Sequence, residues 1–190
     1  MLRSEALAAI YPQLEPHIVV TIMGAVAAEL YALGHRPHFF YMEHSMGLAS
    51  SMGLGIALSL PEEKVIVLDG DGSLLMNLGT LTTMAQHSPC NLLHIVFDNA
   101  SFLSVGGYPT ATAGRTDLAG IARASGIPCV MEASTIDEFK SAFTQALAGE
   151  ALTTLIARVE PVGPASFHMD LALLENRFQF KRALEARRRS

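Results

Sequence analysis

The sequence has only two cysteines and no tryptophan, and charged residues make up just 16% of its 190 positions. Cys90 and Cys129 cannot by themselves form a disulfide framework or a thiolate metal cluster. Half of the residues are hydrophobic. Because disordered chains are rich in charge and poor in apolar residues, this composition excludes disorder for most of the chain. The shortage of charge also predicts that some surface is buried against another chain, including by self-association.

The chain also lacks the positive charge of a general nucleic-acid binder, since its net charge is -5. Its N-terminal residues show no apolar core or cleavage pattern of a signal peptide. Uncharged stretches cover 18–28, 45–61 and 72–97. The first two are shorter than the roughly 20 residues that span a bilayer, and Pro89 and Asn91 interrupt the third. We therefore expect a cytoplasmic protein with neither a membrane nor a nucleic acid as its partner.

Short β-branched runs alternate with longer helical patterns along the whole chain. This alternation is typical of βαβ units, whose parallel sheet is covered by helices on both faces. The sequence thus predicts one α/β domain over 1–190, with three α/β/α layers, a six-stranded parallel sheet and a C-terminal helix at about 170–188. The expected strands are 18–22, 38–42, 64–68, 92–97, 127–131 and 152–159, and the expected helices are 24–33, 47–60, 74–87, 117–125, 136–148 and 170–186.

Polar residues follow two of these strands. Gly70, Asp71, Gly72 and Ser73 come directly after the third strand. Glycine amides at the start of a helix can approach an anion closely. The Asp71 carboxylate would repel a phosphate unless a divalent cation lay between them, and Mg²⁺ commonly bridges carboxylates to phosphate oxygens. A plain tight turn is the alternative explanation for these four residues.

Asn99 follows the fourth strand, immediately after Asp98. Ligands of open α/β sheets bind beyond the carboxyl ends of the strands. If the third and fourth strands are neighbours, Asn99 offers a neutral oxygen to an ion held by Asp71. Asp98 and Asn99 are otherwise a simple turn pair, and it is the combination with the Gly-Asp-Gly turn that favours a metal site.

The two segments together resemble the thiamine diphosphate motif of the pyrophosphate-binding domain in thiamine-dependent enzymes. The resemblance extends along most of the chain, through EHSMGLASSMGLGIALSLP, GSLLMNLGTLTTMA and HIVFDNASFLSVGGYPT. These segments resemble sulfopyruvate and phosphonopyruvate decarboxylases, and most of all the β subunits of two-subunit sulfopyruvate decarboxylases. The resemblance implies a thiamine diphosphate-binding fold, thiamine diphosphate and Mg²⁺ as cofactors, and decarboxylation of a small 2-oxo acid.

The resemblance also implies roles for individual residues of the two turns. The side chains of Asp71 and Asn99, with the main-chain carbonyl of Ser101, would ligate Mg²⁺. Gly70, Gly72 and Ser73 would hold the diphosphate.

A third segment, His44-Ser45-Met46-Gly47, matches the part of the family that contacts the middle of the cofactor. Met46 would prop the cofactor in a bent shape, and ordinary core packing is its alternative role. The carbonyl of His44 would accept a hydrogen bond from the aminopyrimidine, and its side chain is a candidate proton donor. Related enzymes commonly have glycine at this position. Ser45 and Gly47 complete the predicted cofactor-binding set.

No residue matches the glutamate that activates the pyrimidine ring in such enzymes, because that residue belongs to a separate domain. Glu29, expected on a helix surface, and Glu43 lie in no context that marks them for the role. We therefore expect a pyrimidine-domain partner subunit to complete the site. Two alternatives remain open: an acetolactate-synthase-like or other thiamine-dependent transferase subunit, and a catalytically silent cofactor-binding module.

Overall fold

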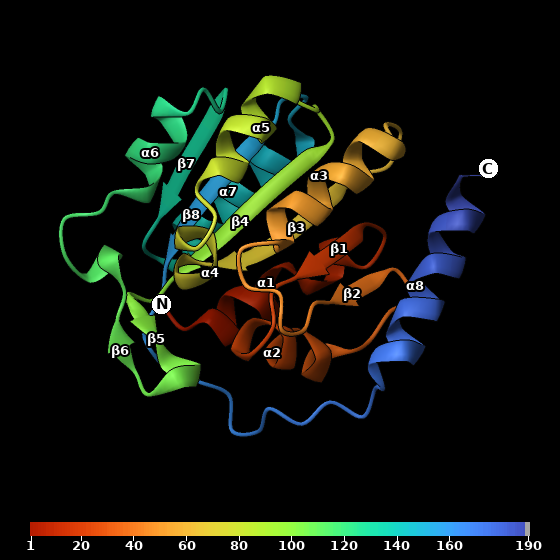
Figure 1. Ribbon diagram of the computed structural model, residues 1–190, viewed down its shortest axis with the longest axis horizontal. Coiled ribbons are helices and arrows are strands. Elements are labelled where there is room, and N and C mark those ends of the chain that lie inside the picture. Colours follow the sequence, from red (N-terminus) through yellow and green to blue (C-terminus); the bar gives the residue numbers. More distant parts are fainter. Residues whose placement is uncertain (189–190) are drawn as a thin grey trace.

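The computed structural model describes residues 1–188 and is built around one six-stranded parallel sheet (Figure 1). The strand order is β2-β1-β3-β4-β8-β7. Residues 189 and 190, the end of the basic C-terminal run, lie outside the described residues. The strands of this sheet are β1 (Ile18–Thr21), β2 (Phe39–Tyr41), β3 (Val65–Gly70), β4 (Leu92–Asp98), β7 (Cys129–Ala133) and β8 (Thr153–Arg158).

The central strands are apolar along their whole length because both of their faces are covered. Every residue of β1 and β4 is buried, and so are the first five residues of β3. On one face α1 (Arg3–Leu14) packs against α2 (Ala25–Leu33) and α7 (Ile136–Ala148), and on the other α3 (Ala49–Ser59) packs against α5 (Gly79–His87). The helix α6 (Leu118–Ala124) packs against β7 and β8. This arrangement confirms the predicted three-layer α/β fold.

The C-terminal helix α8 (Leu173–Arg187) lies along the edge strand β2, at the end of the sheet farthest from β7 (Figure 1). Its buried Asn176 bonds the strand backbone twice, accepting from the amide of Tyr41 at 3.1 Å and donating to the carbonyl of Phe39 at 2.9 Å. An uncovered edge strand is a template for unwanted pairing. The amide side chain of Asn176 therefore satisfies part of the edge that β2 would otherwise expose.

Several local features differ from those expected. The helix predicted over 74–87 is two helices, α4 (Asp71–Leu75) and α5, with a turn between them. The strand predicted over 127–131 begins at Cys129, since Pro128 has no N–H to offer the sheet. Two further features were not predicted: α1, and the small hairpin of β5 (Ser101–Phe102) and β6 (Tyr108–Pro109).

Two short 3₁₀ turns, η1 (Leu103–Val105) and η2 (Ala111–Ala113), flank strand β6 of this hairpin. As to membranes, no helix within residues 1–188 is long and apolar enough to cross one.

Candidate cofactor site

A pocket of about 80 Å³ lies beyond the carboxyl ends of β1, β3 and β4. Parallel strands place their carboxyl ends at the same edge of the sheet, where α/β proteins bind ligands. The pocket brings together seven of the ten predicted site residues: Met46, Gly70, Asp71, Gly72, Ser73, Asn99 and Ser101. Residues as far apart in the sequence as Met46 and Ser101 therefore line one small cavity.

The turn after β3 leads straight into α4, a helix of only five residues. So short a helix has little dipole, and what the turn offers an anion is its backbone amides. Of these, the amide of Gly72 also bonds the Asp71 carboxylate. Gly72 is required here by its neighbour, because a Cβ atom at this position would lie 2.5 Å from the ring of Phe102. The hairpin thus packs directly over the Gly-Asp-Gly turn.

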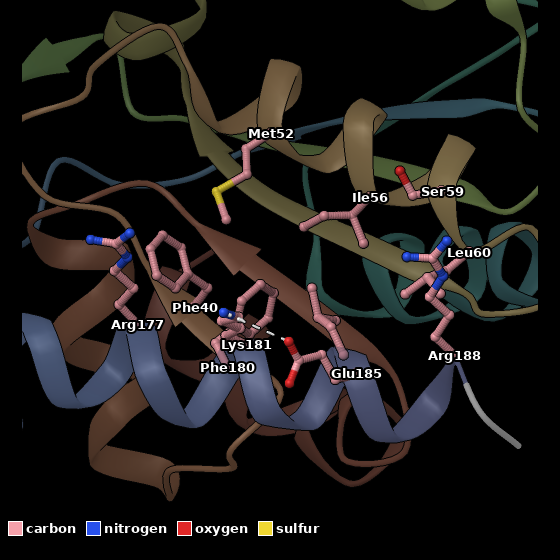
Figure 2. Close-up of a pocket in the computed structure, with 11 residues that line it drawn as sticks. Phe40, Met52, Ile56, Ser59, Leu60, Arg177, Phe180, Lys181, Glu185 and Arg188 are labelled. Atoms are coloured by element: carbon pink, nitrogen blue, oxygen red, sulfur yellow. Dashed lines mark ion pairs between the residues drawn. The ribbon is translucent and has the colours of Figure 1, made fainter.

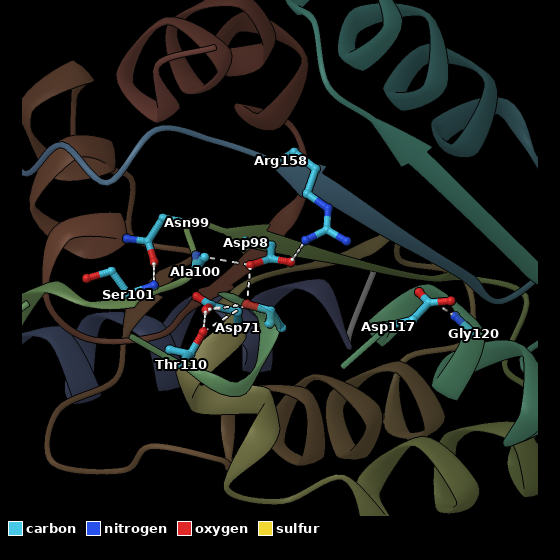
Figure 3. A network of polar contacts seen from close by, with 10 residues as sticks. Asp71, Asp98, Asn99, Ala100, Ser101, Thr110, Asp117, Gly120 and Arg158 are labelled. Atoms are coloured by element: carbon cyan, nitrogen blue, oxygen red, sulfur yellow. Dashed lines mark hydrogen bonds and ion pairs between the residues drawn. The ribbon is translucent and has the colours of Figure 1, made fainter. Parts of the chain in front are cut away.

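Asp71 is buried, and hydroxyl groups rather than cations surround its carboxylate (Figure 3). Thr110 donates a hydrogen bond to Oδ2 at 2.6 Å, and the hydroxyl of Thr112 lies 3.2 Å from the same oxygen. Burial raises the pKa of Asp71, the charge of Asp98 raises it further, and the bond from Thr110 opposes the rise. A cation in the pocket would relieve this cost, since it favours the ionised carboxylate.

The turn after β4 is sharp and is held by its own side chains. Asp98 accepts a hydrogen bond from the amide of Ala100 at 3.1 Å, and Asn99 Oδ1 accepts one from the amide of Ser101 at 2.9 Å. Ala100 has a φ of 56°, in the left-handed region that L-residues seldom adopt. The side-chain bonds stabilise this strained turn, which carries Asn99 and Ser101 at the pocket.

The segment before α3 is hydrogen-bonded to α4 and to the turn that follows it. Gly47 donates its N–H to the Ser73 hydroxyl at 3.0 Å, and its carbonyl accepts from the side chain of Asn77 at 2.9 Å. Asn77 belongs to the turn between α4 and α5, so the break in the predicted helix provides this contact. Met46, beside Gly47, lines the pocket. Gly47 itself does not line it and contributes through its backbone.

His44 and Ser45 do not line the pocket within the described chain. The His44 side chain is 84% exposed, and its Nε2 lies 3.9 Å from the carboxylate of Glu43. Its φ of 52° turns the backbone sharply. The Ser45 hydroxyl donates to the carbonyl of Glu43 at 2.9 Å. The predicted contacts of both residues with a cofactor stay predictions.

Arg3 lines the pocket, although no pattern in the sequence indicated it. Its guanidinium donates to both carboxylate oxygens of Glu29 at 2.9 Å and to the carbonyl of Val162 at 3.1 Å. The Glu29 side chain is only 9% exposed. The expectation that Glu29 lies on a helix surface is therefore wrong, because this ion pair joins α2 to α1 in the interior. Local periodicity could not reveal a contact between residues 26 positions apart.

The donor set of the pocket suits Mg²⁺. Asp71 provides one carboxylate, Asn99 an amide oxygen and Ser101 a carbonyl. Mg²⁺ in proteins is typically held by one or two carboxylates together with ligand phosphates and waters. No cluster of three or more His, Cys, Asp or Glu side chains that could hold a metal occurs in residues 1–188. A metal here would therefore take much of its coordination from a bound diphosphate.

A larger cavity, of about 660 Å³, lies between α3 and α8 (Figure 2). Its floor is apolar, with Phe40, Ile56 and Phe180 among the lining residues. Its one carboxylate, Glu185, is 3.7 Å from the amino group of Lys181. The cavity borders a helical layer and not the strand ends, and it has no glycine turn. It thus lacks the groups that a metal-bound diphosphate needs.

Comparison with known proteins identifies the family of this domain. Residues 20–157 match the family described as "Thiamine pyrophosphate enzyme, C-terminal TPP binding domain". The fold is similar to that of benzoylformate decarboxylase from Polynucleobacter necessarius, with a TM-score of 0.72 and 18% identity over 86% of this chain and 34% of that one.

Relatives with higher identity differ in how much of their length this chain covers. Sulfopyruvate decarboxylase subunit beta of Methanocaldococcus jannaschii is 38% identical over 90% of both chains. Phosphonopyruvate decarboxylase of Streptomyces hygroscopicus is 41% identical over 75% of this chain but only 35% of its own length. The chain therefore belongs to the thiamine pyrophosphate enzyme family, and the part of those enzymes that it shares is the C-terminal thiamine pyrophosphate-binding domain.

Proposed function

We propose that this chain is the diphosphate-binding subunit of a thiamine diphosphate- and Mg²⁺-dependent 2-oxo acid decarboxylase. A separate pyrimidine-domain subunit would complete its active site. The observation that carries the proposal is the shared pocket of Asp71, Asn99 and the Gly72–Ser73 amides. The similarity to relatives named as beta subunits, which covers 90% of one such chain, supports the subunit role.

The size of the pocket supports a half-site. Pockets for whole small molecules usually measure about 300–1,000 Å³, whereas this one measures about 80 Å³. That space suits the metal-diphosphate end of the cofactor alone. The remainder would lie between this chain and its partner.

Exposed apolar side chains flank the pocket and support a partner that covers it. Leu48 and Met76 adjoin the Gly47 segment, and Val105 and Tyr108 belong to the hairpin region. Tyr108 is 70% exposed. Groups of exposed apolar residues commonly mark interaction sites. A subunit placed over the pocket would bury them and exclude water from the cofactor.

When bound, thiamine diphosphate supplies an electron-accepting thiazolium for the electron pair released as a 2-oxo acid loses CO₂. The residues of this chain would bind and orient it. Asp71, Asn99 and the Ser101 carbonyl would hold Mg²⁺, and the Gly72 and Ser73 amides would donate to the diphosphate. Met46 would contact the cofactor from the opposite wall of the pocket. The Arg3–Glu29 pair would leave no free charge on that wall, since each neutralises the other.

The test is an assay of CO₂ release with thiamine diphosphate and Mg²⁺. The chain is assayed alone and with the subunit encoded beside it, against a panel containing pyruvate, sulfopyruvate and phosphonopyruvate. We expect release only from the pair. Carboligation products without net release would favour the transferase alternative, and cofactor binding without turnover by any pairing would identify a silent module.

Asp71→Asn provides the matched test of the metal site. We expect it to abolish Mg²⁺-dependent cofactor binding, measured by equilibrium dialysis, while the far-ultraviolet circular dichroism is retained. Asp137→Asn, which removes an exposed carboxylate on α7, is the control and should bind as the wild type does. Unchanged cofactor affinity in Asp71→Asn would exclude the proposed site.

A further inference from the structure

Asp98 makes contacts with both halves of the proposed metal site, although it does not line the pocket. It is the last residue of β4 and its side chain is fully buried. Its Oδ1 accepts from the Thr112 hydroxyl at 2.7 Å and from the amide of Ala100 at 3.1 Å. Its Oδ2 accepts from Arg158 at 2.5 Å (Figure 3). Both of its carboxylate oxygens are thus engaged by named partners.

The contact through Thr112 leads to Asp71. The Thr112 hydroxyl lies 2.8 Å from that of Thr110, and Thr110 donates to Asp71. Each hydroxyl has one proton. The short distances assign the Thr110 proton to Asp71 and the Thr112 proton to Asp98. The two threonines therefore lie between the two buried carboxylates and give each a hydrogen-bond partner.

The contact through Ala100 leads to the other half of the site. Ala100 has left-handed backbone geometry, and its amide is held by Asp98. The same turn presents Asn99 and Ser101 to the pocket. The Asp98 carboxylate therefore supports two parts of the site: the Asp71 side chain, which follows β3, and the Asn99–Ser101 turn, which follows β4.

Arg158 makes this support possible. It ends β8 and pairs in register with Asp98 across the sheet. A buried carboxylate without a cation is costly. Arg158 compensates the charge of Asp98, and of the two carboxylates only Asp71 lines the pocket within the described residues. The guanidinium is partly exposed and the carboxylate is fully buried. Arg158 therefore lies between the buried polar network and the solvent.

We propose that Asp98, Thr112 and Arg158 are positioning residues that hold the Asp71 carboxylate and the Asn99–Ser101 turn in one fixed arrangement for Mg²⁺. The proposal rests on the proposed function, since it concerns the same metal site. Partners that orient metal ligands commonly change metal affinity about 10- to 100-fold when they are removed. None of the three residues is expected to touch the metal or the substrate.

Thr112→Val tests the proposal with little change in side-chain volume. We expect the Mg²⁺ concentration for half-saturation of thiamine diphosphate binding to rise about 10- to 100-fold in equilibrium dialysis. Thr112→Ser should restore it, because serine keeps the hydroxyl. Thr144→Val, at an exposed position on α7, is the matched control. A wild-type Mg²⁺ requirement in Thr112→Val would overturn the proposal.

Arg158→Met is a second variant in case Thr112→Val does not fold. Charge alone would strengthen cation binding in this variant, because a positive group is removed. Positioning predicts the opposite result, a higher Mg²⁺ requirement. Tighter binding of Mg²⁺ by Arg158→Met would therefore overturn the proposal.

A metal-free measurement separates this proposal from the proposed function. Hydrogen exchange of the Ala100 and Ser101 amides should be faster in Thr112→Val than in the wild type, with exchange in β4 itself unchanged. Unchanged exchange of those amides would contradict the positioning role. If the wild-type chain bound no Mg²⁺ with any partner, the proposed function would fail, and the exchange result would still decide whether Thr112 holds the turn.

Discussion

The N–H of Gly47 donates a hydrogen bond to the hydroxyl of Ser73 at 3.0 Å, across 26 positions of sequence. This bond joins the segment before α3 to the first turn of α4. Met46 is adjacent to one end and Gly72 to the other. The two walls of the pocket therefore have a direct connection that does not depend on the sheet between them.

We predict that Ser73→Ala weakens both the fold and the cofactor site. Removing the hydroxyl leaves the buried amide of Gly47 without its partner, which typically costs about 1–3 kcal/mol. The free energy of unfolding in urea should fall by that amount, and thiamine diphosphate should bind more weakly. Ser141→Ala, at an exposed position on α7, serves as the control. Equal stability of the two variants would show that the bond contributes little.

We predict that Gly72→Ala is destabilising because of Phe102. The added Cβ would lie 2.5 Å from the ring, and crowding of this kind typically costs about 1–3 kcal/mol. Urea unfolding measures the loss. The double variant Gly72→Ala/Phe102→Leu should recover part of it, because the smaller side chain vacates the contact. If the double variant were as unstable as Gly72→Ala alone, the loss of stability would come from the backbone at position 72 and not from the Phe102 ring.

The Arg3–Glu29 pair gives a prediction about stability. Both side chains are almost fully buried, at 3% and 9% exposure. Breaking a buried pair by removing one partner typically costs about 3–5 kcal/mol, since the other charge remains without compensation. Arg3→Met should therefore destabilise the chain strongly in urea, and Arg3→Met/Glu29→Met should be more stable than the single variant. Strictly additive effects of the two substitutions would contradict a coupled pair.

The stability of the chain should fall in mild acid. Burial lowers the pKa of His17 and His38 below the usual 6.5, and nearby cations lower it further at His17, while the Glu15 carbonyl bound to His38 opposes the shift there. Below pH 6.5 the unfolded chain takes up protons that the folded chain resists, so the free energy of unfolding decreases as pH falls through this range. Well above pH 6.5 these histidines are neutral in both states and the effect vanishes.

Urea unfolding between pH 7.5 and pH 5 measures this decline. His38→Gln should make it shallower, whereas His87→Gln, at an exposed position, should retain the wild-type slope. A wild-type slope in His38→Gln would show that His38 does not contribute.

The amino-acid sequence by itself determined the sheet and the location of the site. Strands such as β4 are covered on both faces, so their sequences are nearly continuous apolar runs, which can be recognised without the structure. The carboxyl ends of neighbouring parallel strands meet at one edge, so Asp71 and Asn99 could be placed together from their positions after two strands.

Only the tertiary structure decided how the side chains around that pocket are connected. The links from Asp71 to Thr110 and from Asp98 to Arg158 span 39 and 60 positions. Periodicity describes only neighbouring turns of the chain, so it cannot indicate such pairs. The exposure of His44 and the burial of Glu29 follow from the packing of whole elements against one another. For that reason seven of the residues that line the pocket or its turns could be selected along the chain, while the contacts that support them could not.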